Sequence, residues 1–175
     1  MATYGKGDET GGAFMVLGPE EGQNFWQPVP SNGHISVRVA PKMVEMEHPI
    51  GLGTQTLPPG SYVREHVHDR SEEVLHFISG TGKAVVEGVV HHVSPGTTIY
   101  VGKNRRHKFI NDGETELHWL WLIVPNGLED FFEAIGRSKA AGEAPPAPFP
   151  RPENVLEIER QTVFGLPIAD KGAGL

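Results

Sequence analysis

The sequence contains no cysteine, which excludes disulfides, thiolate metal ligands and a cysteine nucleophile. Positive charge is scarce: 15 Lys and Arg against 22 Asp and Glu leave a net charge of -7, which disfavours nucleic acid as a partner. No apolar run approaches the ~20 residues of a membrane span. Because the first ten residues also lack the apolar core of a signal peptide, we expect a soluble cytoplasmic protein that binds neither nucleic acid nor membrane.

Glycine and proline, by contrast, are abundant. The 175 residues include 22 Gly and 15 Pro, far too many for a helical bundle, while 38% hydrophobic residues suffice for a core. The length suits one domain. The composition therefore favours many short strands that are joined by turns.

The pattern of apolar residues agrees with an all-β fold up to Pro125. Short apolar or alternating segments are separated by Gly, Pro, Asn and Asp, at a spacing typical of a sandwich or barrel. Strands are predicted at residues 13–17, 25–26, 34–39, 51–57, 62–68, 73–79, 83–86, 89–93, 97–101, 107–111 and 116–124.

After Pro125 the pattern changes to helical. Apolar residues at 128, 131, 132 and 135 predict a short amphipathic helix that ends at Gly136, and a proline-rich connector leads to a second helix at 153–162. The predicted organisation is a flexible arm at 1–12, a β-domain at 13–125, a helical extension at 126–168 and a frayed tail at 169–175.

Three residues in the middle of the chain suggest a metal site. His66 and His68 are two positions apart on a predicted strand, so both imidazoles project to one face. Glu73 opens the next strand, and a hairpin would return its carboxylate beside them. Two neutral nitrogens and a carboxylate can bind a divalent metal. An HxH pair alone is weak evidence, since exposed strands carry such pairs without function.

The residues around this pair form a longer motif. From Gly60 to Gly80 the sequence is G-x5-HxH-x4-E-x6-G, which resembles the first motif of the cupin superfamily. From Gly96 the spacing through His107 to Asn111 resembles the second motif, G-x5-PxG-x2-H-x3-N. Here Gly102 replaces the usual Pro and Asn104 the usual Gly; Asn tolerates the left-handed backbone that such a turn requires.

This resemblance covers residues 51–124 and implies a cupin jelly-roll barrel, an antiparallel double sheet, here with short C-terminal helices. It also implies that His66, His68, Glu73 and His107 converge on one divalent transition metal per chain. Glu72 is the alternative carboxylate, but only Glu73 lies at the right distance from Gly80 and shares a strand face with Phe77. Fe(II) is the favoured ion; Mn, Co, Ni or Zn would also suit these ligands.

Several other residues are candidates for substrate binding. Arg64 and Tyr62 share the strand face of His66, and Arg64 either grips an anionic oxygen of the substrate, with a catalytic role, or turns to solvent. Interior aromatic side chains could line the site, although they are more often plain core. These candidates are Phe77, Phe109, Trp119 and Trp121. The other histidines, such as His76 and His118, lack partners at ligand spacing.

The resemblance implies an enzyme that acts on a small molecule. We expect a dioxygenase for a small oxygenated substrate, such as a phenol, enol or diketone, in which Glu73 stays a ligand or acts as a base. The C-terminal pattern also looks like that of small quercetin-dioxygenase-like cupins. The alternatives are a non-redox isomerase, lyase or decarboxylase that uses the metal as a Lewis acid, and a metal-containing binding or sensing barrel without turnover.

We also expect a homodimer. Cupins of this size commonly pair through exposed sheet edges, and three groups of residues offer apolar surface for such pairing. These are Phe14, the Phe25-Trp26 pair and the terminal helices.

Overall fold

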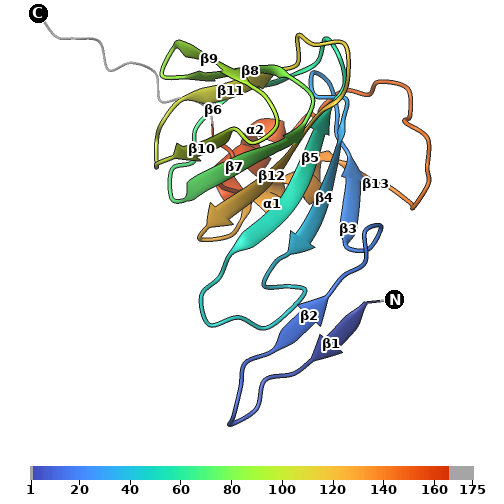
Figure 1. The fold of residues 1–175 in the computed structure, drawn as a ribbon, viewed down its shortest axis with the longest axis vertical. Helices are drawn as coiled ribbons and strands as arrows, with labels where there is room; N and C mark the ends of the chain where they lie inside the picture. The colour runs from blue at the N-terminus through green and yellow to red at the C-terminus, as the bar shows by residue number, and fades with distance from the viewer. Residues whose placement is uncertain (1, 166–175) are drawn as a thin grey trace, which may run out of the picture.

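The computed structural model describes residues 2–165 and consists mainly of two antiparallel sheets that face each other (Figure 1). The larger sheet has the strand order β10-β7-β12-β5-β4-β3-β13 and the smaller one β6-β11-β8-β9. In the larger sheet the strands are β3 (Gln23–Trp26), β4 (His34–Val39), β5 (Gly51–Leu57), β7 (Glu72–Ser79), β10 (Thr98–Val101), β12 (Leu117–Val124) and β13 (Arg137–Ser138). In the smaller sheet they are β6 (Tyr62–His66), β8 (Gly82–Val86), β9 (Val89–Val93) and β11 (His107–Ile110).

The predicted double-sheet, all-β fold with short C-terminal helices is confirmed. Strands β4, β5 and β9 have the predicted bounds, and the others differ by a few residues. Helix α1 (Leu128–Ile135) is also found as predicted, and α2 (Val155–Gln161) is shorter than expected. The two-residue β13 was not predicted, because nothing in its sequence distinguishes it from a loop. None of the described helices is long and apolar enough to cross a membrane.

The N-terminal residues form a hairpin that extends from the two sheets (Figure 1). Its strands are β1 (Thr3–Gly5), which the sequence did not predict, and β2 (Phe14–Val16). The phenyl ring of Phe14 is 55% exposed, as a dimer surface would require. Trp26, however, is buried in the core, so this part of the predicted apolar surface was assigned wrongly. The predicted tail at 169–175 lies outside the described residues.

The core lies between the sheets and is filled by alternate residues of the long strands. In β12 the buried positions include Trp119, Trp121 and Ile123, whereas His118 and Leu120 face the other way, as predicted. Helix α1 contributes Phe131 and Phe132 to the same core, so this apolar pair packs within the chain. Burial of such side chains contributes ~1.5–3 kcal/mol each and is the main stabilising force of the barrel.

The turns at both cupin-like motifs follow from residues with an unusual backbone. Gly80 has a φ of 80°, and a side chain there would meet the carbonyl oxygen of Glu116 at 2.3 Å, so only glycine fits. Asn104 has a φ of 60°, which confirms that asparagine supports the left-handed turn ahead of β11. Its backbone N–H donates to the carbonyl oxygen of His68 at 2.9 Å. The two motifs are therefore bonded to each other beside the candidate site.

Candidate metal centre

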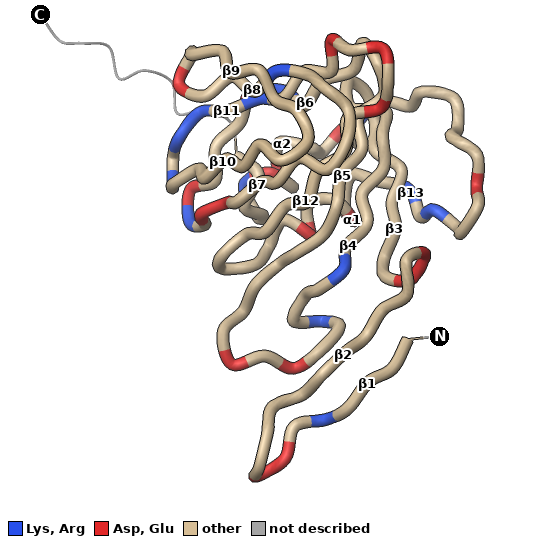
Figure 2. The backbone as a smooth tube through the Cα atoms, viewed as in Figure 1, with Lys and Arg blue, Asp and Glu red and all other residues tan. Residues whose placement is uncertain are grey.

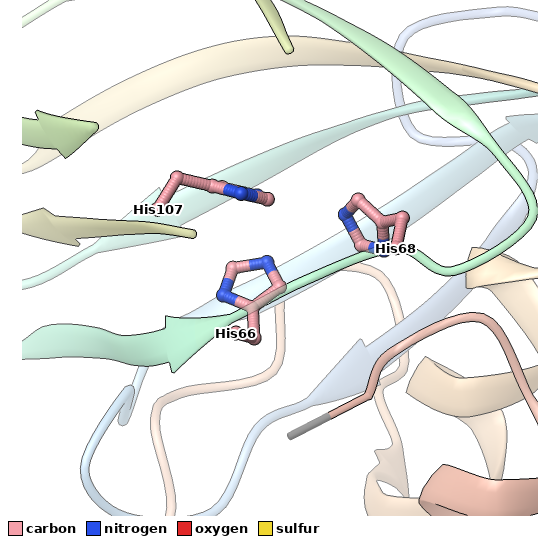
Figure 3. Close-up of side chains that lie close together, drawn as sticks. All are labelled: His66, His68 and His107. Carbon is pink, nitrogen blue, oxygen red and sulfur yellow. The ribbon is translucent and has the colours of Figure 1, made fainter. Parts of the chain in front are cut away.

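Three histidines, two on strands of the smaller sheet and one in the loop after β6, converge between the two layers. His66 ends β6, His107 begins β11, and the two are register partners in adjacent strands. His68 follows two residues after His66, as the HxH spacing predicts. One ring nitrogen from each of the three lies within 4.8 Å of the others, and all three residues are buried. Figure 3 shows the three rings pointing toward one another.

The opposite sheet supplies a carboxylate to this cluster. Glu73 on β7 is 4% exposed, and its Oε2 lies 3.4 Å from Nε2 of His68 and 3.3 Å from Nε2 of His107. Glu72, by contrast, is exposed and faces away. The structure therefore brings together the four residues that were predicted as ligands, and it separates Glu73 from its rival for the reason that was predicted, strand alternation.

The second nitrogen of each ring is held by a backbone carbonyl. Nδ1 donates to the carbonyl oxygen of Arg64 at 2.9 Å in His66, of Val163 at 2.8 Å in His68 and of Arg105 at 2.9 Å in His107. Because a carbonyl oxygen only accepts, these bonds place the proton on Nδ1. Each Nε2 then carries a lone pair. Such outer bonds are typical of metal-ligating histidines, whose ring orientation they fix.

Several polar atoms of this cluster have no hydrogen-bond partner. Among the described residues, Nε2 of His68, Nε2 of His107 and Oε2 of Glu73 are buried and make no hydrogen bond. Leaving such atoms unpaired away from water costs ~1–3 kcal/mol each. A cation that is coordinated by these lone pairs would remove that cost. The residues present therefore fit a divalent metal, and three imidazoles with one carboxylate suit Fe, Mn, Co, Ni or Zn.

The charges in the cluster also favour cation binding. Burial raises the pKa of the Glu73 carboxyl, but the neighbouring His107 and His68 outweigh burial and lower the pKa to about 2. Burial, together with His107 and His68, keeps the pKa of His66 well below its ordinary value. At neutral pH the cluster thus offers an ionised carboxylate at Glu73 and a neutral imidazole at His66, the forms that bind metals. Burial lowers the pKa of His68, but the nearby carboxylate of Glu73 outweighs burial and raises it, so a metal ion would compete with a proton at that ring.

Asn111, the last residue of the second motif, has a structural role. It is fully buried, and its Nδ2 donates to the carbonyl oxygens of Leu57 at 2.6 Å and Thr115 at 2.9 Å. Its Oδ1 accepts from the backbone N–H of Gly113 at 3.0 Å. The motif asparagine therefore fixes the loop between β11 and β12 and does not contact the histidine cluster in any of these bonds.

Arg64 lies beside the cluster but is already paired. Its guanidinium forms an ion pair with Glu159 of α2, and Arg151 reaches the same carboxylate oxygen, Oε1, at 2.6 Å. Arg64 is therefore not turned fully to solvent, and in this structure Glu159 occupies its guanidinium. Tyr62, 46% exposed, lines a cavity together with Arg64. Whether these two residues bind a substrate stays a prediction.

The four aromatic candidates lie in the core. Phe77, Phe109 and Trp119 contact one another with ring centroids 5.5–6.2 Å apart, and Phe109 touches the ring of His107 at 5.7 Å. Trp121 packs against Phe132 of α1. Trp121 and Phe77 are fully buried. In this structure they act as core residues that pack beneath the histidine cluster, the simpler of the two roles considered for them.

Sequence reasoning missed the residues that cover the histidines. Val163 bonds to His68, and the ring of Phe164 stacks on that of His66 with centroids 4.0 Å apart and planes at 11°. Both belong to the segment after α2, and both are buried. The only available signal was an apolar Val-Phe pair directly after a helix, which does not reveal a contact with residues almost 100 positions earlier.

Basic residues gather in the loop that precedes β11 (Figure 2). Lys103 and Arg105 are exposed, and Arg106 approaches Glu87, with Nε 4.0 Å from Oε2. The arrangement agrees with a solvated loop in an acidic protein.

Comparison with known proteins places this architecture in a family. Residues 53–123 match the family described as Cupin domain. Protein SchB of Streptomyces halstedii is 28% identical over 74 residues, which are 42% of this chain and 54% of SchB, so the match spans about half of that protein.

Solved structures agree on the fold. A sugar phosphate isomerase of the cupin superfamily from Silicibacter pomeroyi has a TM-score of 0.54 at 16% identity, over 64% of this chain and 76% of that one. The polyketide cyclase RemF from Streptomyces resistomycificus has a TM-score of 0.50 at 16% identity, over 57% and 70%.

Proposed function

Because this chain belongs to the cupin superfamily through residues 53–123, we propose that it is a metal-dependent enzyme that oxygenates a small oxygenated organic molecule. Phenols, enols and diketones are the proposed substrate classes. The observation that most directly supports the metal dependence is the set of buried polar atoms on His68, His107 and Glu73 that have no hydrogen-bond partner among the described residues. Fe(II) is the proposed ion.

A divalent ion held by these side chains would supply positive charge to ionise a substrate hydroxyl and, if it is Fe or Mn, the means to activate dioxygen. The chain's own residues prepare the site. The three carbonyl bonds to Nδ1 orient the imidazoles before the ion arrives. The buried rings of Phe77, Phe109 and Trp119 exclude water from the interior side of the site. This exclusion strengthens electrostatic interactions in the site.

Glu73 has two proposed roles: it stays a ligand throughout, or it leaves to accept a proton from the substrate. With a pKa of about 2 it is ionised at neutral pH, which both roles require. A Glu73→Gln substitution would weaken metal binding in the first case. In the second it would leave metal content intact and abolish turnover.

Non-redox chemistry is the second candidate function. It is suggested by two proteins with this fold, which are named as an isomerase and a polyketide cyclase. Neither name denotes an oxidation. Oxygen consumption separates the two candidates. Turnover of a candidate phenol or diketone that stops when oxygen is removed supports oxygenation, whereas equal turnover without oxygen supports isomerase, lyase or decarboxylase chemistry.

The experiment that tests the metal site is elemental analysis of the wild type and of single variants. We expect about one transition-metal ion per chain in the wild type, and loss of most of it in His66→Ala and His107→Ala. His76→Ala is the matched control, because His76 is exposed on β7 and bonds to Thr98 instead. Full metal content and activity in His66→Ala would contradict the proposal. A metal-loaded protein without turnover on any tested substrate class would instead favour a binding or sensing barrel.

The homodimer stays a proposal as well. Tyr4, Phe14 and Val16 of the N-terminal hairpin are each more than half exposed and supply apolar area for pairing. Sedimentation at high concentration that shows only monomer would remove this proposal without affecting the metal site.

A further inference from the structure

Residues 162–165 lie across the histidine cluster and are bonded to the loop that carries it. The backbone of Gly165 pairs with that of Val67 through two N–H to O bonds, at 2.9 and 3.3 Å. The carbonyl oxygen of Val163 accepts the bond from His68 described above. These three hydrogen bonds hold the segment against the histidine cluster.

Within this segment, Phe164 fills a slot that is one aromatic ring thick. One face of its ring stacks on His66, with centroids 4.0 Å apart and planes at 11°. The other face stacks on Phe131 of α1, with centroids 4.1 Å apart and planes at 1°. The slot walls come from β6 and α1, while the ring between them comes from a separate segment. Parallel walls of this kind select flat, unsaturated groups over puckered ones.

Positive charge borders the same slot. The Arg64 guanidinium carbon lies 5.0 Å from the centre of the Phe164 ring, and Arg64 and Arg151 share the single carboxylate of Glu159. Both arginines use the same oxygen, Oε1. The other oxygen, Oε2, and Nε of Arg64 are buried and have no hydrogen-bond partner within residues 2–165. Two guanidinium groups therefore face one carboxylate from α2, and their hydrogen-bonding capacity is incompletely used.

On the side of Arg64 and Arg151, the space beside the slot is small. A cavity of about 40 Å³ is lined by Phe131, Phe164, Arg64, Arg151 and Tyr62, among others. It can hold one or a few water molecules but no organic substrate. A ligand of the size of a single aromatic ring can reach the slot only if the Phe164 ring leaves it.

We propose that Phe164 and Glu159 occupy the binding site of a planar aromatic substrate that carries an anionic group. The aromatic ring of the substrate takes the slot between His66 and Phe131, and its carboxylate or phenolate pairs with Arg64 and Arg151. Residues 162–165 thereby act as an internal competitor that must be displaced. This inference rests on the proposed function, because it names the substrate class of the same site.

A binding measurement on the full-length chain loaded with Zn²⁺ tests the inference without any turnover. The probes are 2-naphthoate and its uncharged counterpart 2-naphthalenemethanol, titrated by calorimetry. Removing the ring in Phe164→Ala removes the competitor, so we expect naphthoate to bind at least about tenfold more tightly than to the wild type. Phe164→Leu, which keeps most of the slot filled, is the matched control and should gain less.

The charge contribution is tested separately. In Phe164→Ala, naphthoate should bind more tightly than naphthalenemethanol, and the additional substitution Arg151→Gln should reduce that preference. Phe164→Ala that is folded by circular dichroism and holds its metal, yet binds naphthoate no better than the wild type, would overturn the inference. So would equal binding of both probes.

A second variant covers the case in which Phe164→Ala does not fold. Glu159→Gln keeps the shape of the side chain but releases both arginines from their carboxylate. We expect it to bind naphthoate several-fold more tightly with little change for naphthalenemethanol; no gain for naphthoate would overturn the inference. Because the readout is binding of a probe, an inactive but ring-binding protein would contradict the proposed function and leave this inference standing.

Discussion

Two groups of aromatic side chains lie within a short distance of the histidines, and they are built differently. The interior group, Phe77, Phe109 and Trp119, comes from three strands, and its rings meet at tilted or edge-on angles between 37° and 61°. The entrance group stacks His66, Phe164 and Phe131 in parallel. Its members come from a strand, a terminal segment and a helix.

The difference shows which group belongs to the scaffold and which to the site. The interior rings are held by strands that are hydrogen-bonded on both sides, and they have no charged neighbour in the ring contacts given above. Phe164 is held by a short terminal segment and has Arg64 beside its ring. Both groups thus bury aromatic area, but only the entrance group has an arginine beside one of its rings and a member that no sheet holds. Two predictions test this contrast, and a third concerns a histidine outside both groups.

The largest effect is expected from truncating the interior group. Phe77→Ala should lower the free energy of unfolding by ~3–5 kcal/mol, because the cavity lies between two sheets that cannot collapse onto it. Phe164→Ala should cost less, since the loss is limited to the free energy with which residues 162–165 dock on the barrel. Urea denaturation followed by far-UV circular dichroism measures both. Equal losses would mean that the terminal segment is as integral to the barrel as β7.

Metal binding should give the next largest effect. A divalent ion at a hundred times its dissociation constant should add about 2.7 kcal/mol to the stability of the wild type, because it binds the folded state. Phe164→Leu should keep this gain, and His107→Ala should lose it. Thermal unfolding with and without Zn²⁺ is the measurement. Loss of the gain in Phe164→Leu would show that the entrance ring is required to hold His66 in its metal-binding orientation.

The smallest effect concerns His34, whose ring contacts Trp26 outside both groups at 5.6 Å. Burial, with Lys139 and His118 nearby, lowers the pKa of His34 to about 4 from its ordinary 6.5. His34 therefore binds a proton near pH 6.5 in the unfolded chain, but only near pH 4 in the folded chain. The contribution of neutral His34 to the free energy of unfolding is therefore fully present above pH 6.5 and is lost as the pH falls toward 4.

His34 is partly open to solvent, so its share of that loss is reduced to about 1 kcal/mol. Urea denaturation of the wild type and His34→Gln between pH 7 and 4 measures the difference. Parallel pH curves for the two proteins would show that His34 titrates normally in the folded state.

Local sequence features were sufficient for most of the barrel. Alternating apolar residues gave the bounds of β4 and the buried face of β12, and Pro125 marked the change to helix α1. The same alternation distinguished Glu73 from Glu72. These predictions succeed because side-chain direction in a strand depends only on position, so that neighbours two apart share a face.

Contacts between distant segments could not be obtained in this way. The strand β1 depends on its partner β2, and the short β13 on its pairing with β3. Burial of Trp26 follows from its place between β4 and β13, which no local pattern shows. Arg64 was considered either as a substrate ligand or as a solvent-exposed residue. Its partner Glu159 lies 95 positions later in the chain, so neither reading could include it.

The amino-acid sequence by itself was sufficient to identify the four candidate ligands, because the spacing of His66, His68, Glu73 and His107 follows two motifs that can be read from a single chain. Only the tertiary structure decided what covers those ligands. Phe164 and Glu159 reach the site through long-range packing of a terminal segment. The free energy of such packing depends on surfaces from several elements at once, and no single stretch of sequence records it.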